Sequence, residues 1–370
     1  MSTIPNNPTA SGPLPAQLVP TSQAGPIHVV IDQPRSRLGW LGRRFLWAML
    51  AVSVLFNLSM FGAYNAYFND DGDLQERYHS LSKTAGDKVA IISVEGTIMG
   101  GDGFVKRQID RVRDDDSVKA IVLRVDSPGG TVTGSDYIYH HLKELARERD
   151  IPLVVSMGSI AASGGYYVAM AAGDKEKTIY AEPTTWTGSI GVIIPHYDVS
   201  GLLEKWNVAD DSIASHPLKQ MGSPTRRLPT EEREEERRIL KELVDTSFEG
   251  FKAIVLTNRK ALRENAKAQE SVFTGRIFTA GQAKENGLVD ELGFVEDAID
   301  RAVTLAELNK DDVRVVRFKR PLGVLDGLLG ASASLKQRGG LDLGAVLDLT
   351  APRAYYLCTW LPGLTLAAGE

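Results

Sequence analysis

The chain has 370 residues, 43% of them hydrophobic, and its 42 basic and 47 acidic side chains give a formal net charge of −5. This composition is typical of one large globular domain with appendages or of two small domains. The acidic balance and the lack of a long Lys/Arg run argue against nucleic-acid binding. The single cysteine, Cys358, excludes an internal disulfide, and six scattered histidines show no ligand spacing, so we expect no structural metal.

The first 68 residues predict an arm followed by a membrane anchor. Seven prolines fall within residues 1–39, which predicts a disordered arm over residues 1–42. The next 24 residues, 45–68, carry no formal charge and are long enough to cross a bilayer, so we expect a transmembrane helix over residues 43–68. Arg43 and Arg44 precede this stretch and aspartates follow it, which places the N-terminus in the cytoplasm and everything after residue 70 outside. We expect a polar stalk over residues 69–86.

From Asp87 the pattern alternates between short β-branched runs and helical stretches. Such alternation predicts an α/β domain with a largely parallel sheet. We expect strands at residues 89–94, 120–125 and 152–157 and a weaker one from residue 178, with helices at 104–114, 134–149 and 160–172.

The second half of the chain predicts further helices and a short apolar tail. A long charged helix follows Pro229, with Thr230 as its N-cap and the run EREEERR as a solvated face. Residues 275–300 predict a turn, a helix ended by Gly287 and another helix after Gly293. The apolar run at residues 355–366 is too short to span a bilayer; it could pack on the body, join an oligomer interface or touch the membrane.

Two glycine-rich turns could carry chemistry. The sequence DSPGG at residues 126–130 follows a predicted strand, and its glycines would let backbone N–H groups face a ligand and stabilise an oxyanion; a sharp strand-to-helix turn explains it equally well. The second turn, GSIAASGGYYVA at residues 158–169, places Ser163 near the start of a helix, where developing negative charge is stabilised. Ser163 is therefore a candidate nucleophile, although close packing of small residues is the competing explanation.

A serine nucleophile needs a base that accepts its proton. No histidine of the chain lies in a recognisable triad setting. A lysine in an apolar site can replace histidine, as in Ser-Lys enzymes, but composition does not identify which lysine.

Five motifs, in the family's order, resemble the signal peptide peptidase A family of membrane-bound serine proteases, and the resemblance covers about residues 87–305. They are DSPGG at 126–130, SMGSIAASGGYYVAMAA at 156–172, TGSIGVI at 187–193, HPLKQMGSPTRRLPTEERE at 216–234 and GRIFTAGQAKENGLVDELG at 275–293. The resemblance implies the Clp protease/crotonase-like fold of repeated ββα units, here as a peptidase domain over residues 87–310 with a tail of open role over 311–370. It implies Ser163 as nucleophile, Lys219 as general base, and Gly130 and Gly164 as backbone oxyanion donors.

The resemblance also implies the setting of the reaction. Such a protein is a serine endopeptidase of the bacterial cytoplasmic membrane, with its catalytic domain on the outer or periplasmic side. It needs no cofactor or metal, degrades remnant signal peptides and other small hydrophobic membrane peptides, and forms ring-like homo-oligomers in which serine and lysine can come from neighbouring subunits.

Two other functions compete with this prediction. A crotonase-like acyl-CoA enzyme would share the fold, but the Ser163 and Lys219 contexts and the anchor count against it. A catalytically silent membrane scaffold would be expected to have lost the serine or the lysine, and both are present. The sequence AEPTTW before TGSIGVI departs from the family pattern, which affects local packing and not the dyad.

Overall fold

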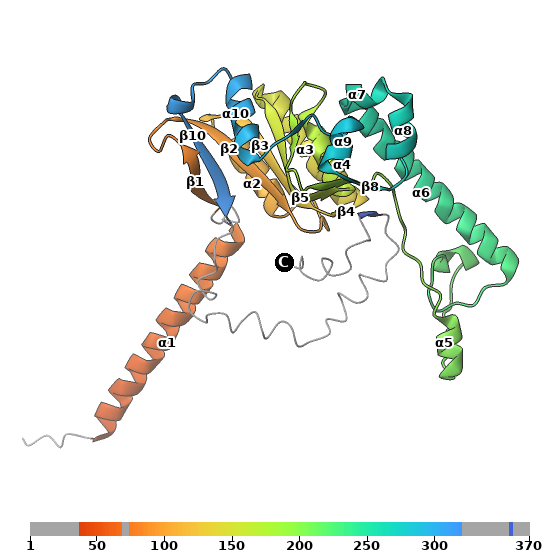
Figure 1. The fold of residues 1–370 in the computed structure, drawn as a ribbon. Coiled ribbons are helices and arrows are strands. Elements are labelled where there is room, and N and C mark those ends of the chain that lie inside the picture. The colour runs from red at the N-terminus through yellow and green to blue at the C-terminus, as the bar shows by residue number, and fades with distance from the viewer. Residues whose placement is uncertain (1–36, 69–73, 320–354, 358–370) are drawn as a thin grey trace, which may run out of the picture. The chain divides into compact units, whose positions relative to one another are not determined.

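The computed structural model describes residues 37–68, 74–319 and 355–357, in two compact units that are described separately (Figure 1). The first unit holds helix α1 (Arg37–Phe68). Its stretch Gly42–Gly62 is long and apolar enough to cross a membrane, and none of this stretch is buried, as a core helix would be. The arm predicted over residues 1–42 lies, up to residue 36, outside the described residues.

The second unit is built on a nine-stranded, mostly parallel sheet in the order β1-β10-β2-β3-β5-β6-β9, with β7 pairing with β5 and β8. Only the β1–β10 and β7–β8 pairs of this sheet are antiparallel. The strands are β1 (Gln75–Leu81), β2 (Asp87–Glu95), β3 (Val118–Ser127), β5 (Leu153–Ala162), β6 (Ile179–Ala181), β7 (Trp186–Gly188), β8 (Ile277–Thr279), β9 (Glu291–Leu292) and β10 (Val313–Lys319). The predicted α/β class with a parallel-rich sheet is confirmed.

The central strands are apolar throughout because both faces of the sheet are covered. Alternate side chains of β2, such as Val89 and Ile91, join a core with the buried face of α10 (Val295–Leu305). Their neighbours Ala90 and Ile92 join the other core, with α2 (Phe104–Arg113) and α3 (Val132–Arg149). The helices predicted at 104–114 and 134–149 are thus confirmed to within two residues at each end.

The remaining helices follow β5 or connect the later strands. They are α4 (Gly164–Ala169), η1 (Met170–Ala172), α5 (Ser200–Lys205), η2 (Pro217–Gln220), α6 (Thr230–Asn258), α7 (Lys260–Arg263), α8 (Ala266–Val272), α9 (Ala280–Glu285) and η3 (Lys310–Asp312). The α6 helix projects from one side of the sheet, and α5 lies below it in the view of Figure 1.

The structure corrects the predicted stalk and the predicted end of the domain. Residues 75–81 are the edge strand β1, which pairs with β10 and so belongs to the sheet. Residues 313–319, assigned to the tail, are the strand β10 itself and pair with β2. Strand β1 has the sequence QERYHSL, in which apolar and polar residues do not alternate. Its backbone hydrogen bonds to β10, and not a buried face, hold it in the sheet.

Two local predictions on the helices are also wrong. Residues 160–162 end strand β5, so the helix predicted over 160–172 begins only at Gly164. The N-cap of α6 is Pro229 and not Thr230, which is the first helical residue and makes no capping hydrogen bond. The helix predicted to end at Gly287 is α9, and the one predicted after Gly293 is α10.

A second, two-stranded sheet includes part of the first glycine-rich turn. Strand β4 (Gly129–Thr131) pairs antiparallel with β11 (Tyr355–Leu357), which comes from the apolar tail. Of the three roles left open for residues 355–366, the described residues 355–357 therefore show packing on the body.

Candidate active site

Ser163 stands on a sharp turn between β5 and α4. Its backbone has a φ of 56° and a ψ of −116°, a region that residues with side chains rarely adopt. The turn is fixed on both sides, because the N–H of Ser163 donates to Gly188 (2.8 Å) and its carbonyl accepts from the N–H of Tyr167 (2.9 Å). A strained strand-to-helix turn of this kind aims the serine hydroxyl into the active site of α/β-hydrolases.

The hydroxyl of Ser163 is buried and has no hydrogen-bond partner among the described residues. The whole residue is 1% exposed. Buried hydroxyl groups nearly always have a hydrogen-bond partner. A buried hydroxyl without one does not stabilise the fold, and this points to a functional role.

The glycine turn that follows β3 reaches the same place from the neighbouring strand. Gly129 has a φ of 99°, and a Cβ atom on Gly130 would stand 1.8 Å from the carbonyl oxygen of Ile98. Only glycine permits this close approach, in which Ile98 donates to the Gly129 carbonyl (2.8 Å) and accepts from Thr131 N–H (2.7 Å). The aspartate of this motif ties the two turns together, since the Asp126 carboxylate accepts from the Ile160 N–H (3.1 Å).

The two glycines predicted as oxyanion donors lie side by side. A Cβ atom on Gly164 would stand 3.1 Å from the amide nitrogen of Gly130, and one on Gly129 would stand 2.6 Å from the amide nitrogen of Gly164. The structure therefore brings Ser163, Gly130 and Gly164 into one place, as an oxyanion hole beside a nucleophile requires.

Lys219 is not brought to this place within the chain. It lies in η2, is exposed, and has no hydrogen bond or ion pair with Ser163 in the described part of the chain. Its segment, residues 195–229, contains no buried residue and is called the projecting segment below. This segment includes α5, which Figure 1 shows well away from α4.

A partly buried ion pair holds the turn that carries Lys219. Arg226 donates to the carbonyl of Pro217 (2.9 Å) and pairs with Glu236 on α6 (3.4 Å). The Glu236 carboxylate also accepts from the N–H of Gly222 (3.3 Å). Glu236 is only 6% exposed, so the prediction of EREEERR as a solvated face is wrong at this position.

Comparison with known proteins places this geometry in a family. Residues 145–309 match the family model described as Peptidase family S49. A Synechocystis protein named only as a candidate protease is 39% identical over 249 residues, which cover 67% of this chain and 85% of that protein.

The chain belongs to peptidase family S49. Protease 4 of Salmonella typhi is 36% identical, over 61% of this chain and 36% of its own length. The chloroplastic serine protease SPPA of Arabidopsis thaliana is 32% identical, over 69% of this chain and 38% of its own length. The chain thus spans less than half the length of these two relatives. The predicted family and the serine-type peptidase class are confirmed.

The S49 family match includes Ser163, Gly164 and Lys219 but begins after Gly130. The position of Gly130 beside Gly164 therefore rests on the structure. Among solved structures, a membrane-bound stomatin-specific protease is 18% identical over 64% of this chain, with a TM-score of 0.40.

Sequence reasoning missed an aromatic pocket next to the glycine-rich turn at residues 158–169. Tyr167, on α4, lies edge-on to Tyr139 of α3 at 5.4 Å between ring centroids, and 5.1 Å from Phe251 of α6. Its hydroxyl donates to Asp136 (2.7 Å); burial, and then this carboxylate, raise the pKa of Tyr167, so the hydroxyl stays protonated. The tyrosine pair in GGYY was the available signal.

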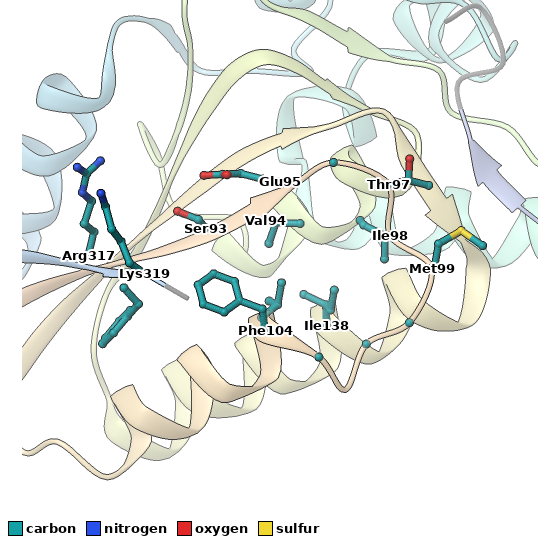
Figure 2. A pocket seen from close by; sticks show the side chains of 16 residues that line it. Ser93, Val94, Glu95, Thr97, Ile98, Met99, Phe104, Ile138, Arg317 and Lys319 are labelled. Atoms are coloured by element: carbon teal, nitrogen blue, oxygen red, sulfur yellow. The ribbon is translucent and has the colours of Figure 1, made fainter. Parts of the chain in front are cut away.

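A separate cavity of about 650 Å³ lies behind β4, on the side of Ile98. Figure 2 shows Ile98, Phe104 and Ile138 in its apolar part and Arg317 and Lys319 at another side. None of its lining residues belongs to the predicted site, and we assign the cavity no part in the chemistry.

Three possible metal ligands gather on α3, where His140, His141 and Glu144 place one ligand atom each within 4.8 Å of one another. Both histidines lie in the middle of α3, within the helix predicted over 134–149. His140 is exposed and His141 half-buried, and neither contacts Ser163 in the described residues.

Proposed function

We propose that this S49 peptidase is a membrane-anchored endopeptidase that cuts peptide bonds with Ser163 as nucleophile and Lys219 as general base. The observation that carries the proposal is the orphaned, buried hydroxyl of Ser163 on a strained turn beside the amides of Gly130 and Gly164. This is the arrangement that acyl transfer through a serine needs.

In this mechanism, Ser163 Oγ attacks the carbonyl carbon of the peptide while the uncharged amine of Lys219 accepts the hydroxyl proton. The N–H groups of Gly130 and Gly164 donate to the oxyanion that forms. The Lys219 ammonium then gives its proton to the leaving amine, and the C–N bond breaks. Water attacks the acyl-enzyme by the same route, which frees the new carboxyl terminus and restores Ser163.

The proposal includes a ring-like homo-oligomer in which Lys219 reaches Ser163 of a neighbouring subunit. Two observations favour it. Lys219 is exposed on the projecting segment, and Ser163 Oγ has no partner among the described residues of its own chain. A head-to-tail ring would give every serine one lysine.

The membrane-related part of the proposal rests on α1. Its apolar stretch would span the bilayer with the N-terminus in the cytoplasm and the peptidase outside. Substrates would then be cleaved signal peptides and other small hydrophobic peptides at that membrane. Protease added to intact spheroplasts should digest the body of the protein; full protection would contradict this orientation.

Mixing two inactive variants tests the proposal most sharply. Full-length Ser163→Ala and Lys219→Ala, purified in detergent, should each lose at least about 10³-fold in activity on an apolar peptide. When the two are dissociated, mixed in equal amounts and reassembled, about a quarter of the sites should hold both groups, and activity should return to that level.

Each other outcome has a definite meaning. Two inactive variants that regain nothing on mixing would place serine and lysine in one chain and overturn the shared site. Cleavage that survives Ser163→Ala would overturn the nucleophile. A wild-type protein that assembles and cuts no peptide would favour the silent scaffold.

A further inference from the structure

The strand β11 fills a slot that is one strand wide. On one side it pairs antiparallel with β4, Tyr356 lying opposite Gly130. On the other side Tyr355 exchanges two backbone hydrogen bonds with Ile193, of 2.9 and 3.0 Å. The far edge of β4 is already paired with Ile98. Without β11, β4 and Ile193 would present two facing backbone edges, which is a site for an extended peptide.

The carbonyl of Tyr356 lies at the proposed oxyanion hole. A Cβ atom on Gly129 would stand 2.1 Å from the Tyr356 oxygen and 2.6 Å from the Gly164 nitrogen. A Cβ atom on Gly164 would stand 3.1 Å from both the Tyr356 oxygen and the Gly130 nitrogen. One carbonyl of the chain's own tail therefore lies among the amides that would hold the carbonyl of a substrate.

The side chain of Tyr356 fills the aromatic pocket. Its ring stacks on Tyr167 at 5.1 Å and 22°, and lies 4.5 Å from the ring of Phe251. Its hydroxyl donates to the carbonyl of Ser247 (3.0 Å). Tyr356 is 2% exposed, so the pocket encloses it completely and satisfies its one polar atom.

We infer that this slot is the substrate-binding cleft, that its aromatic pocket selects a tyrosine-like residue just before the scissile bond, and that Tyr355–Leu357 occupies it as a competing, substrate-like strand. The inference rests on the proposed function, since Ser163 and the glycine amides define which bond is presented. The substrates it selects are extended peptides with an aromatic side chain, tyrosine above phenylalanine, because only a hydroxyl reaches the Ser247 carbonyl.

Peptide binding to an inactive protein tests the inference separately from catalysis. All proteins carry Ser163→Ala, so that neither the probe nor the tail is cut. The probe is a fluorescent apolar peptide with one tyrosine, and its affinity is read by anisotropy. Ending the chain after Ala354 should raise the affinity at least about tenfold, because a tethered competitor acts at a high effective concentration.

Two full-length variants guard against a truncation that fails to fold. Tyr356→Ala removes the anchor of the tail and leaves the pocket intact, so it should raise the affinity nearly as much as the truncation. Tyr356→Phe keeps the ring and loses one hydrogen bond, which should change the affinity by a few-fold only. Probes with phenylalanine or alanine in place of tyrosine should bind progressively more weakly to the truncated chain.

The outcomes distinguish a failure of the proposed cleft from a failure of the proposed function. Equal affinity in the full chain, the truncation and Tyr356→Ala would overturn the competing strand. Equal binding of tyrosine and alanine probes would overturn the aromatic pocket. Tyrosine-selective binding together with a wild type that cuts no peptide would support the cleft and contradict the proposed function alone.

Discussion

The surroundings of Ser163 and the projecting segment of Lys219 are built in opposite ways. Ser163, Gly130 and Gly164 are buried, and close backbone contacts hold them in one conformation. Lys219 lies in a segment without buried residues, held by ion pairs and hydrogen bonds at the surface such as Arg227–Glu204. The proposed nucleophile and oxyanion donors thus lie together within one subunit. The place of Lys219 in the proposed site depends on contact with a neighbouring subunit.

The largest effect on activity is expected from a side chain added among the buried residues around Ser163. In Gly130→Ala the new Cβ would collide with the Ile98 carbonyl and displace β4, so activity should fall at least about 10³-fold. The matched control is Gly281→Ala on α9, where a Cβ meets nothing within 4 Å, and activity should not change. Peptidase assays on both variants, with circular dichroism to record folding, make the comparison. Full activity in Gly130→Ala would contradict its role as an oxyanion donor.

A smaller effect on activity is expected from loosening the turn that carries Lys219. Glu236→Gln removes one charge that pairs with Arg226, so kcat should fall about 10- to 100-fold. Because Arg226 is partly exposed and keeps its ion pair with Glu232 (2.8 Å), the thermal midpoint of the body should change little. Glu235→Gln makes the same charge change on an exposed neighbour and should be silent. If both variants lose stability alike and keep kcat, Glu236 has no positioning role.

The ion pair between Asp115 and Lys88, which belongs to neither region, should control the stability of the fold in acid. Burial would raise the pKa of Asp115, but hydrogen bonds from Ser117 and Lys88 outweigh it and lower the pKa to about 2. The charged carboxylate therefore stabilises the fold above about pH 4, and this contribution is lost as the pH falls towards 2. Asp115→Asn should cost about 1–2 kcal/mol at pH 7 and flatten the decline in stability below pH 4.

Urea unfolding from pH 7 to pH 2 measures this effect. Asp116→Asn, whose carboxylate is fully exposed, is the control and should follow the wild-type curve. An Asp115→Asn protein with the wild-type acid decline would show that other carboxylates set it.

The smallest effect compares one hydroxyl from each region. Tyr166, which follows the Ser163 turn, is fully buried and donates to the Leu288 carbonyl (2.8 Å). Tyr166→Phe removes this buried hydrogen bond and should cost about 1 kcal/mol, whereas Ser200→Ala on the projecting segment removes an exposed hydrogen bond to Asp198 and should cost almost nothing. Calorimetry should show a lower midpoint for the first variant only; equal shifts would mean that the two regions are not as different as their burial indicates.

The sequence predicted the elements whose pattern is local. The runs at 89–94 and 120–125 are strands, as predicted. They are rich in β-branched residues, which fit a strand buried on both faces whatever the sequence of the neighbouring strands. The helix predicted over 160–172 begins too early, because small apolar residues fit a buried strand as well as a helix. Pairing of β5 with β7 makes residues 160–162 a strand. The polar strand β1 left no local signal at all.

The same distinction holds for the site. Ser163 and the glycines belong to short motifs at strand ends, so the topology of a parallel sheet was enough to bring them together. The pocket around Tyr356 joins α3, α4, α6 and the tail across long separations in sequence, and no periodicity reveals such contacts. Whether Lys219 meets Ser163 depends on assembly, which stays a prediction.

The backbone at Ser163 has a consequence for how this gene could change over generations. Its φ of 56° is one that glycine adopts without penalty, whereas a side chain there costs on the order of 1–3 kcal/mol. A mutation to glycine would therefore relax the turn and, under the proposed mechanism, yield a chain that resists heat better but has lost its nucleophile. A screen for thermostability alone would enrich such chains, and a population released from the need to cleave peptides would drift towards them. Under the proposed mechanism, only continued selection for peptide cleavage keeps a serine at this position.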